Sequence, residues 1–193
     1  MADLTKRQKE IIDASINLID ENGIQNLTIK NLAQAMKISE PAIYRHFDSK
    51  LDILIAILDD FNNITGKSLN PAKQKPGSAL EKIEYIFTSH MDIFTEKPSL
   101  AAVVFSEEIF QNDKKLSDTV YAIMKTRFKI ITGIVKQGQT AGEIKSTIPP
   151  EQIALILTGS LRLIVTNWRL SGRAFSLKKE GKEFWETMKK LIV

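Results

Sequence analysis

The stretch "LTIKNLAQAMKISEPAIYRHF", residues 27–47, decides the fold, because two short helices follow one another across a tight turn. Thr28 can cap a first helix whose apolar residues recur at helical spacing. Ser39 can cap a second helix, and its first turn tolerates Pro41 because an amide there has no partner inside the helix. A three-residue turn joins the two. This arrangement predicts a helix-turn-helix motif over about residues 28–47.

The second of these helices has two different sides. At about 100° per residue, Ile43 and Phe47 fall together, and we expect this side to be buried. The outward and flanking positions then carry Pro41, Ala42, Tyr44, Arg45 and His46. Such an open face fits the major groove of DNA, where an arginine can donate two hydrogen bonds to guanine. On periodicity alone, an ordinary surface helix remains the more common interpretation.

Helical signals continue on both sides of the motif. Thr5 followed by Gln8 is typical of a capping box and predicts a first helix that ends at "NG", residues 22–23. Ser49 starts a fourth helix, and the Gly-, Pro- and Ser-rich segment 65–79 is predicted to be a loop.

The remainder of the chain is also predicted to be helical. Five further helices are expected at 78–96, 99–112, 114–141, 150–171 and 177–192. No alternating strand pattern competes, so the predicted fold class is all-α. We expect an N-terminal helix-turn-helix head over residues 1–66 and a larger helical body over residues 67–193.

Composition narrows the function classes. The 193 residues contain no cysteine and two histidines, which argues against a thiolate or histidine-rich metal site, and no cofactor is expected. The net charge is +4, but residues 1–50 hold seven basic and seven acidic side chains, so bulk charge does not indicate nucleic acid. The N-terminal segment lacks the apolar core of a signal peptide, and "IALILTGSLRLIVTNW" looks too short and too polar for a membrane span. A cytoplasmic protein is expected.

Enzyme motifs are weak in this chain. "GKS", residues 66–68, lacks the preceding glycine of a phosphate-binding loop, because Phe61 stands at that position and no strand precedes it. Ser89 and His90 are neighbours on a helix and point in different directions. We therefore predict that the protein is not an enzyme.

The segment "LTIKNLAQAMKISEPAIYRHFDSKLDIL", residues 27–54, resembles the DNA-binding head of the tetracycline-repressor (TetR) family. The shared pattern is leucine-threonine, isoleucine or leucine-alanine, a short turn, serine, tyrosine-x-histidine-phenylalanine and lysine-x-x-leucine. The resemblance covers about the first 60 residues and implies a transcriptional regulator that binds a DNA operator. It implies phosphate or base contacts from Thr28, Lys30, Ser39, Glu40, Pro41, Ala42, Tyr44, Arg45, His46 and Lys50. The resemblance does not predict the operator sequence, because the residues at the base-reading positions vary among members of the family.

Residues 150–171 are apolar on nearly every side, so this helix needs cover on both faces. A second subunit can supply that cover, with Gly159 and Ser160 permitting close approach. The family resemblance implies a homodimer through residues 150–171 and 177–192, and two-fold symmetry then predicts a near-palindromic operator. A single buried helix in a monomer is the alternative.

The resemblance also implies an effector pocket in the body, for a small apolar ligand that releases a repressor from its operator. The candidate lining residues are Phe87, His90, Met91, Phe94, Phe105, Tyr121, Met124, Phe128 and Trp168, with Phe110, Thr158 and Asn167 nearby. Aromatic residues at helical spacing are also typical of an ordinary core. The alternative function is a DNA-organising or nucleoid-associated protein without an effector.

Overall fold

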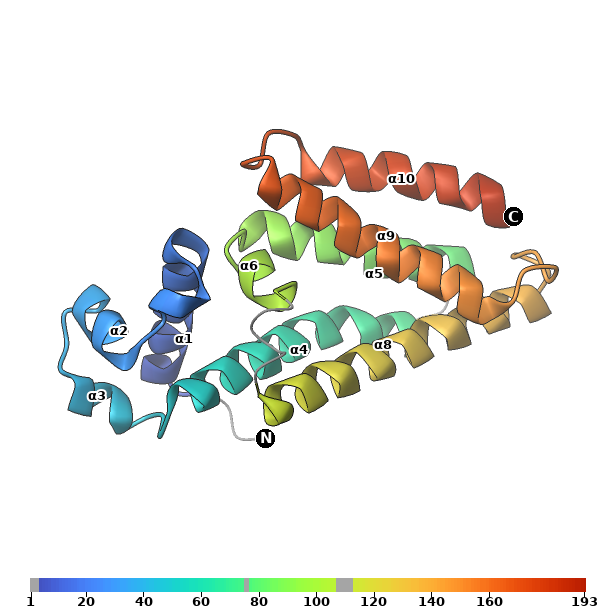
Figure 1. Ribbon diagram of the computed structural model, residues 1–193. Coiled ribbons are helices and arrows are strands. Elements are labelled where there is room, and N and C mark those ends of the chain that lie inside the picture. Colours follow the sequence, from blue (N-terminus) through green and yellow to red (C-terminus); the bar gives the residue numbers. More distant parts are fainter. Residues whose placement is uncertain (1–3, 75–76, 107–112) are drawn as a thin grey trace. The chain divides into compact units, whose positions relative to one another are not determined.

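The computed structural model describes residues 4–74, 77–106 and 113–193 of the chain, the side chains of residues 67–74 excepted. Within these ranges all regular structure is helical, as predicted. The chain forms two compact units (Figure 1). We call residues 1–61 with 99–120 the head unit, and residues 62–98 with 121–193 the body unit.

The head unit begins with α1 (Lys6–Asn22), which is held at its start by the predicted capping box. The Thr5 hydroxyl accepts a hydrogen bond from the Gln8 amide at 3.2 Å, and the Gln8 side chain accepts one from the Thr5 amide at 3.0 Å. Gly23 ends the helix with a φ of 76°, a conformation that favours glycine. A short 3-10 turn, η1 (Ile24–Asn26), then leads into the helix-turn-helix motif.

The motif consists of α2 (Ile29–Ala35) and α3 (Glu40–Tyr44). Thr28 caps α2, because its hydroxyl accepts a hydrogen bond from the Asn31 amide at 3.0 Å. Ser39 occupies the N-cap position of α3, but its side chain makes no capping hydrogen bond. The chain therefore forms the predicted pair of short helices, and α3 is only five residues long.

The head unit also contains α6 (Leu100–Val104), which packs against α1. Its side chains from Leu100 to Val103 are buried. The predicted helix 99–112 extends past this element, and its residues 107–112 lie outside the described ranges.

Two long helices, α4 (Lys50–Gln74) and α8 (Lys114–Thr140), each contribute residues to both units. The prediction of a loop over residues 65–79 was wrong for residues 65–74, which continue α4. Thr65 is fully buried, and Arg127 of α8 donates hydrogen bonds to Thr65 and to Asn62. Intrinsic propensity is a weak prior that tertiary contacts can override, with a cost of about 1 kcal/mol for a glycine and about 3 kcal/mol for a proline such as Pro71.

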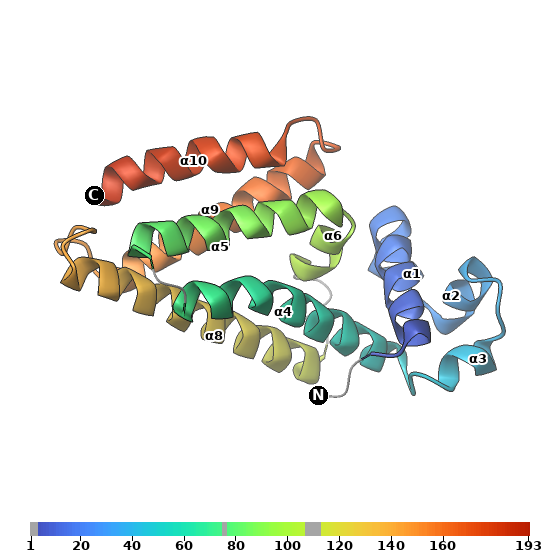
Figure 2. The same ribbon diagram turned by 180° about the vertical axis from the view of Figure 1, so that it is seen from behind.

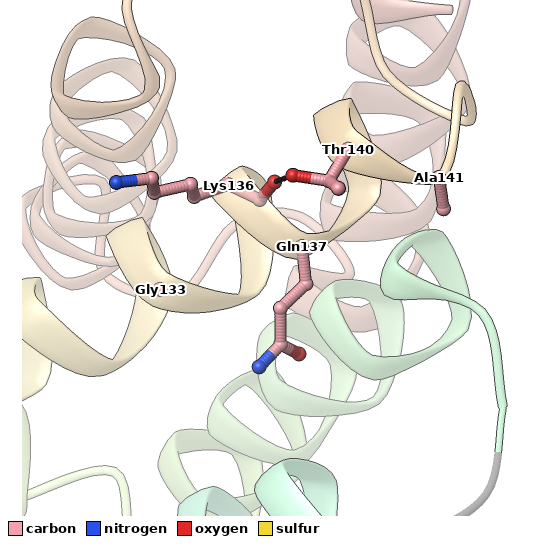
Figure 3. Close-up of a pocket in the computed structure, with 5 residues that line it drawn as sticks. All are labelled: Gly133, Lys136, Gln137, Thr140 and Ala141. Atoms are coloured by element: carbon pink, nitrogen blue, oxygen red, sulfur yellow. Dashed lines mark hydrogen bonds between the residues drawn. The ribbon is translucent and has the colours of Figure 1, made fainter.

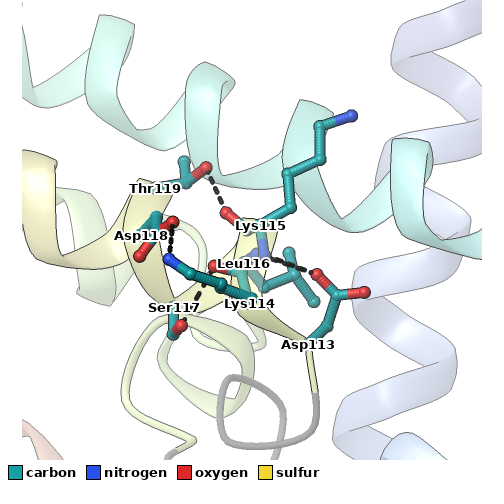
Figure 4. A network of polar contacts seen from close by, with 7 residues as sticks. All are labelled: Asp113, Lys114, Lys115, Leu116, Ser117, Asp118 and Thr119. Carbon is teal, nitrogen blue, oxygen red and sulfur yellow. Dashed lines mark hydrogen bonds and ion pairs between the residues drawn. The ribbon is translucent and has the colours of Figure 1, made fainter.

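The start of α8 is a network of local polar contacts within the head unit (Figure 4). The Asp113 carboxylate accepts hydrogen bonds from the amides of Lys115 at 2.8 Å and Leu116 at 3.1 Å. Lys114 pairs with Asp118 at 2.6 Å one turn later. The carboxylate satisfies amides that have no partner in the first turn of a helix, so Asp113 fixes where α8 begins.

The body unit is built on α5 (Ala79–Glu96), α9 (Pro150–Leu170) and α10 (Leu177–Ile192), which lie against one another in both views (Figure 2). Apolar residues of these helices and of α8 form its core, around the fully buried Trp185. Close approach of α10 to α5 depends on Gly181, where an added Cβ atom would lie 2.8 Å from Cγ of Met91.

One histidine is buried in this unit. Nδ1 of His90 lies 2.7 Å from the carbonyl oxygen of Ile86, and the residue is 6% exposed. Burial, with a smaller contribution from the charge of Arg127, lowers the pKa of His90 to about 4, although the hydrogen bond to Ile86 acts in the opposite direction. His90 is therefore neutral near pH 7.

By length and composition, α9 would suffice to cross a membrane, with a mean hydropathy of 1.2 over a window that is 28% buried. Its length and hydropathy are thus closer to those of a membrane span than its polar residues suggest. A helix that packs inside a water-soluble protein passes the same test, and Arg162 lies in the middle of this one.

Two glycines of α8 predict opposite effects of alanine on the free energy of unfolding. At Gly138 an added Cβ atom would lie 2.6 Å from Cβ of Ala79 and 2.8 Å from Cδ1 of Ile144, so Gly138→Ala should destabilise the fold by about 1–3 kcal/mol. At Gly133 nothing lies within 4 Å, so Gly133→Ala should stabilise it by about 0.5–1 kcal/mol. Urea unfolding at one protein concentration measures both. Equal effects of the two changes would contradict the close packing at Gly138.

Candidate nucleic-acid interface and effector region

The buried and exposed residues of α3 and the turn after it lie on the sides that the sequence predicts. Ile43 is fully buried and Phe47 is 7% exposed, whereas Tyr44 is 49% exposed. The exposed or partly exposed positions around them are Ser39, Glu40, Pro41, Ala42, Arg45 and His46. The short helix is therefore anchored on one side and open on the other.

The end of α3 is tied to α1. The Gln8 side-chain amide donates a hydrogen bond to the backbone carbonyl of His46 at 3.5 Å, across 38 residues of sequence. Gln8 thus serves both the capping box of α1 and the end of α3. This bond, together with the burial of Phe47, fixes where the open face of α3 ends.

The start of α2 adds further exposed polar groups. Thr28 and Lys30 are exposed, and the Thr28 hydroxyl still has its own hydrogen to donate, because it accepts the capping bond from Asn31. Two asparagine side chains that sequence reasoning did not identify stabilise the turn η1 before α2. Asn31 donates to the Asn26 carbonyl at 2.9 Å, and Asn26 donates to the Asn22 carbonyl. The only sequence signal for these bonds is the recurrence of asparagine at positions 22, 26 and 31.

Lys50 has a structural role within the head unit. Its ammonium group donates a hydrogen bond to the carbonyl of Ile24 at 3.2 Å, and partial burial lowers the pKa of this lysine. The bond ties the first residue of α4 to η1. An ammonium group has three donors, so Lys50 can hold this turn and still donate to a phosphate.

The residues predicted to line an effector pocket differ in burial and do not all belong to one unit. Phe87, His90, Met91, Phe94 and Trp168 are buried in the body unit. Phe105 and Phe128 are partly buried, and Phe105 belongs to the head unit. Tyr121 and Met124 are 66% and 53% exposed. Phe110 lies outside the described residues.

Several of the buried residues have identifiable packing roles. Phe87 stacks on Phe184 of α10, with ring centroids 5.3 Å apart. The indole nitrogen of Trp168 donates to the carbonyl of Phe175 at 3.0 Å, in the turn between α9 and α10. These contacts hold α10 in place, so both aromatic residues contribute to the core whether or not a ligand binds.

The body unit has a surface hollow on α8, away from the residues that the sequence predicts to line a pocket (Figure 3). It is lined by Gly133, Lys136, Gln137, Thr140 and Ala141, which recur at helical spacing along one side of α8. The hollow is open, and none of the residues predicted from the sequence lines it.

The outer side of α9 carries exposed apolar residues. Leu155, Ile156, Leu163 and Leu170 are 46–70% exposed, and Leu191 and Val193 at the end of α10 are also more than half exposed. Gly159, on the same helix, has open space beside it. The buried side of α9, which includes Ile153, Leu157 and Val165, packs within the body unit, so the helix presents a second apolar face to its surroundings.

Comparisons with known proteins agree with this geometry. Residues 11–57 match the family model described as bacterial regulatory proteins of the tetR family, and residues 61–191 match the model described as the C-terminal region of YsiA-like proteins. The fatty acid metabolism regulator protein of Bacillus subtilis (strain 168) is 26% identical over 174 residues, which cover 89% of each chain.

A second relative is the nucleoid occlusion factor SlmA of Actinobacillus pleuropneumoniae, 24% identical over 60% of this chain and 57% of that protein. Among solved structures, the regulator FadR from Bacillus subtilis in complex with stearoyl-CoA has the same fold. Its TM-score is 0.81 at 24% identity, over 95% of this chain and 97% of that one.

The two family models together span the helix-turn-helix motif and nearly the whole body. The chain therefore belongs to the TetR family of ligand-responsive, DNA-binding transcriptional regulators.

Proposed function

We propose that the chain is a repressor that binds a near-palindromic operator as a homodimer and releases it when a long-chain acyl-CoA thioester binds to the body. The observation that carries DNA binding is the open face of α3, where Tyr44 and Arg45 are exposed above the buried Ile43. Arg45 can read guanine in the major groove, and exposed polar groups on either side can contact phosphates. No catalytic activity is proposed, and the protein acts in the cytoplasm, where its operator lies.

The class of effector is inferred from two relatives. One is a regulator of fatty acid metabolism, and the other binds stearoyl-CoA. An acyl chain needs an apolar site, and the body unit holds a large aliphatic and aromatic core around α5, α8 and α10. This proposal replaces the small apolar effector expected from the sequence with a larger, amphipathic ligand, a fatty acyl thioester of coenzyme A.

The homodimer is proposed to form through α9 and α10. A face with exposed leucines is costly in water, at roughly 25 cal/mol per Å² of apolar surface. Pairing two copies about a two-fold axis covers the face on both subunits at once. Such pairing gives the apolar outer side of α9 a cover, while its inner side already packs within the body unit.

The proposed switch uses α4, because this helix has residues in both units. Its first residue, Lys50, is bonded to η1 ahead of the motif, and its later residues Asn62 and Thr65 are bonded to Arg127 in the body unit. A ligand that shifts Arg127 would displace α4 and so change the separation of the two heads. A coupling free energy of about 1–3 kcal/mol would weaken operator binding roughly 5- to 150-fold.

A second candidate function is supported by the similarity to SlmA, a nucleoid occlusion factor. A DNA-organising protein would share the head and the dimer but would bind many scattered sites without an effector. The similarity covers only 57% of that relative, so a ligand-controlled regulator is favoured.

We predict that Tyr44→Ala and Arg45→Ala each lower the affinity for an operator selected by the parent chain. Loss of a bidentate arginine–guanine pair should cost about 1–3 kcal/mol, and the melting temperature should stay unchanged because both side chains are exposed. Fluorescence anisotropy with the selected duplex measures the affinity. Tyr121→Ala is the matched control, because Tyr121 is an even more exposed tyrosine in the body unit. Unchanged specificity in both head variants would refute the proposed role of α3.

We predict that Leu163→Glu converts the dimer to a monomer. Leu163 is 60% exposed in the single chain, so glutamate there should leave the fold intact but place a charge in the proposed interface. Light scattering after size-exclusion chromatography measures the mass, and circular dichroism measures the helix content. Met124→Glu, at a residue 53% exposed on α8, is the control. A Leu163→Glu protein that remains dimeric would place the interface elsewhere.

We predict that stearoyl-CoA releases the selected duplex from the chain. The apparent affinity for DNA should fall roughly 5- to 150-fold at saturating ligand. Free coenzyme A and free stearate are the controls, since each supplies half of the ligand. If coenzyme A alone releases the DNA equally well, the acyl chain is not what the body recognises. If no acyl-CoA changes DNA binding or the melting temperature, the DNA-organising function gains support.

A further inference from the structure

The turn between α2 and α3 contains a residue with an unusual backbone conformation. Lys37 has a φ of 54°, in the left-handed region that glycine adopts freely and other residues avoid. Its amide donates to the Gln34 carbonyl at 3.1 Å, and the next amide, of Ile38, donates to the Ala33 carbonyl at 3.0 Å. This pair of hydrogen bonds is the Schellman motif, and Lys37 stands at the position where glycine is usual.

Arg173, the other described non-glycine residue with a positive φ, offers a comparison, because it too has a long cationic side chain. Arg173 has a φ of 66° in the turn between α9 and α10, and its guanidinium lies 5.8 Å from the centroid of the Trp168 ring. At Arg173 the strained backbone is therefore accompanied by a side-chain contact within the protein, the contact with the Trp168 ring.

Lys37 has no such use within the part of the chain that the structure describes. Its side chain is exposed, and no hydrogen bond or ion pair of its ammonium group is found among those residues. Glu40, the nearest acidic residue along the sequence, is also exposed and forms no described pair with it. The ammonium group of Lys37 is therefore available to a partner outside the protein.

The place of Lys37 in the fold indicates what that partner is. Two residues separate Lys37 from Glu40, the first residue of α3, so its Cα atom lies within about 8 Å of Ser39 at the N-cap. In a helix-turn-helix protein the N-terminal residues of the second helix enter the major groove, and the phosphates of the groove edge lie beside them. A lysine ammonium at that point meets the backbone of the duplex.

We propose that Lys37 is a phosphate-contacting residue that positions α3 on DNA, and that its charge is the reason this turn does not contain glycine. The proposal rests on the proposed function as a DNA-binding regulator. It adds a contact that neither the helix wheel nor the resemblance to the family assigns. Because a phosphate contact is independent of sequence, Lys37 contributes equally to binding of the operator and of unrelated DNA.

The experiment compares Lys37→Gly, Lys37→Asn and Lys37→Arg with the parent chain. Glycine and asparagine both accept the left-handed conformation without the charge, so the first two variants should keep the turn and the melting temperature. The affinity for a mixed-sequence duplex and for the selected operator is measured by fluorescence anisotropy from about 50 to about 200 mM salt. Lys125→Gln, which removes one exposed charge from α8 in the body unit, is the control.

We expect Lys37→Gly and Lys37→Asn to lower both affinities about five-fold near 0.15 M salt and to reduce the slope of log affinity against log salt by about 1. Lys37→Arg should restore the slope, and Lys125→Gln should not change it. An unchanged slope in the glycine and asparagine variants overturns the proposal, even if affinity falls, since the loss would then come from turn geometry. If the parent chain binds no duplex, the proposed function itself fails, and the two failures are thus distinguishable.

Discussion

The burial of Ile43 and Phe47 is the constraint on which the DNA-binding face depends. A helix of five residues has too few internal hydrogen bonds to be stable in water on its own, so α3 exists because its inner side is packed. The same packing sets the rotation of the helix about its axis. Tyr44 and Arg45 are exposed as a geometric consequence, since they lie about 100° and 200° around the helix from Ile43. If α3 reads DNA as proposed, affinity and specificity depend on these two buried apolar side chains.

The head could be predicted from the sequence because its signals are local. Capping residues Thr5 and Thr28, the "NG" turn and the spacing of Ile43 and Phe47 each act within a few residues, and the structure shows them in those roles. The bond from Lys50 to Ile24 could not be predicted in the same way, because it joins residues 26 positions apart. Helical periodicity places side chains around one helix and carries no information about which distant carbonyl a lysine will reach.

The body shows the same limit more clearly. Composition predicts a loop over residues 65–79, whereas tertiary contacts from Arg127 accompany a helix that runs to Gln74. Most of the candidate effector residues are large and apolar, a property that core packing and ligand binding share. The stacking of Phe87 on Phe184 and the bond from Trp168 to Phe175 are packing roles that sequence alone could not separate from a pocket wall. Polar partners decide that question, and they depend on the fold.

The polar contacts of α4 connect the stability of the fold to the proposed switch. Lys50 gives up part of its hydration to bind η1, and Arg127 is buried deeply enough that its pKa falls to about 10 while it remains charged at neutral pH. A buried cation that bonds to Thr65 is costly to leave without acceptors, so a ligand cannot displace it without moving α4 or replacing its partners. A buried, hydrogen-bonded charge favours two discrete arrangements, which is the property that the proposed switch between a DNA-bound and a released state requires.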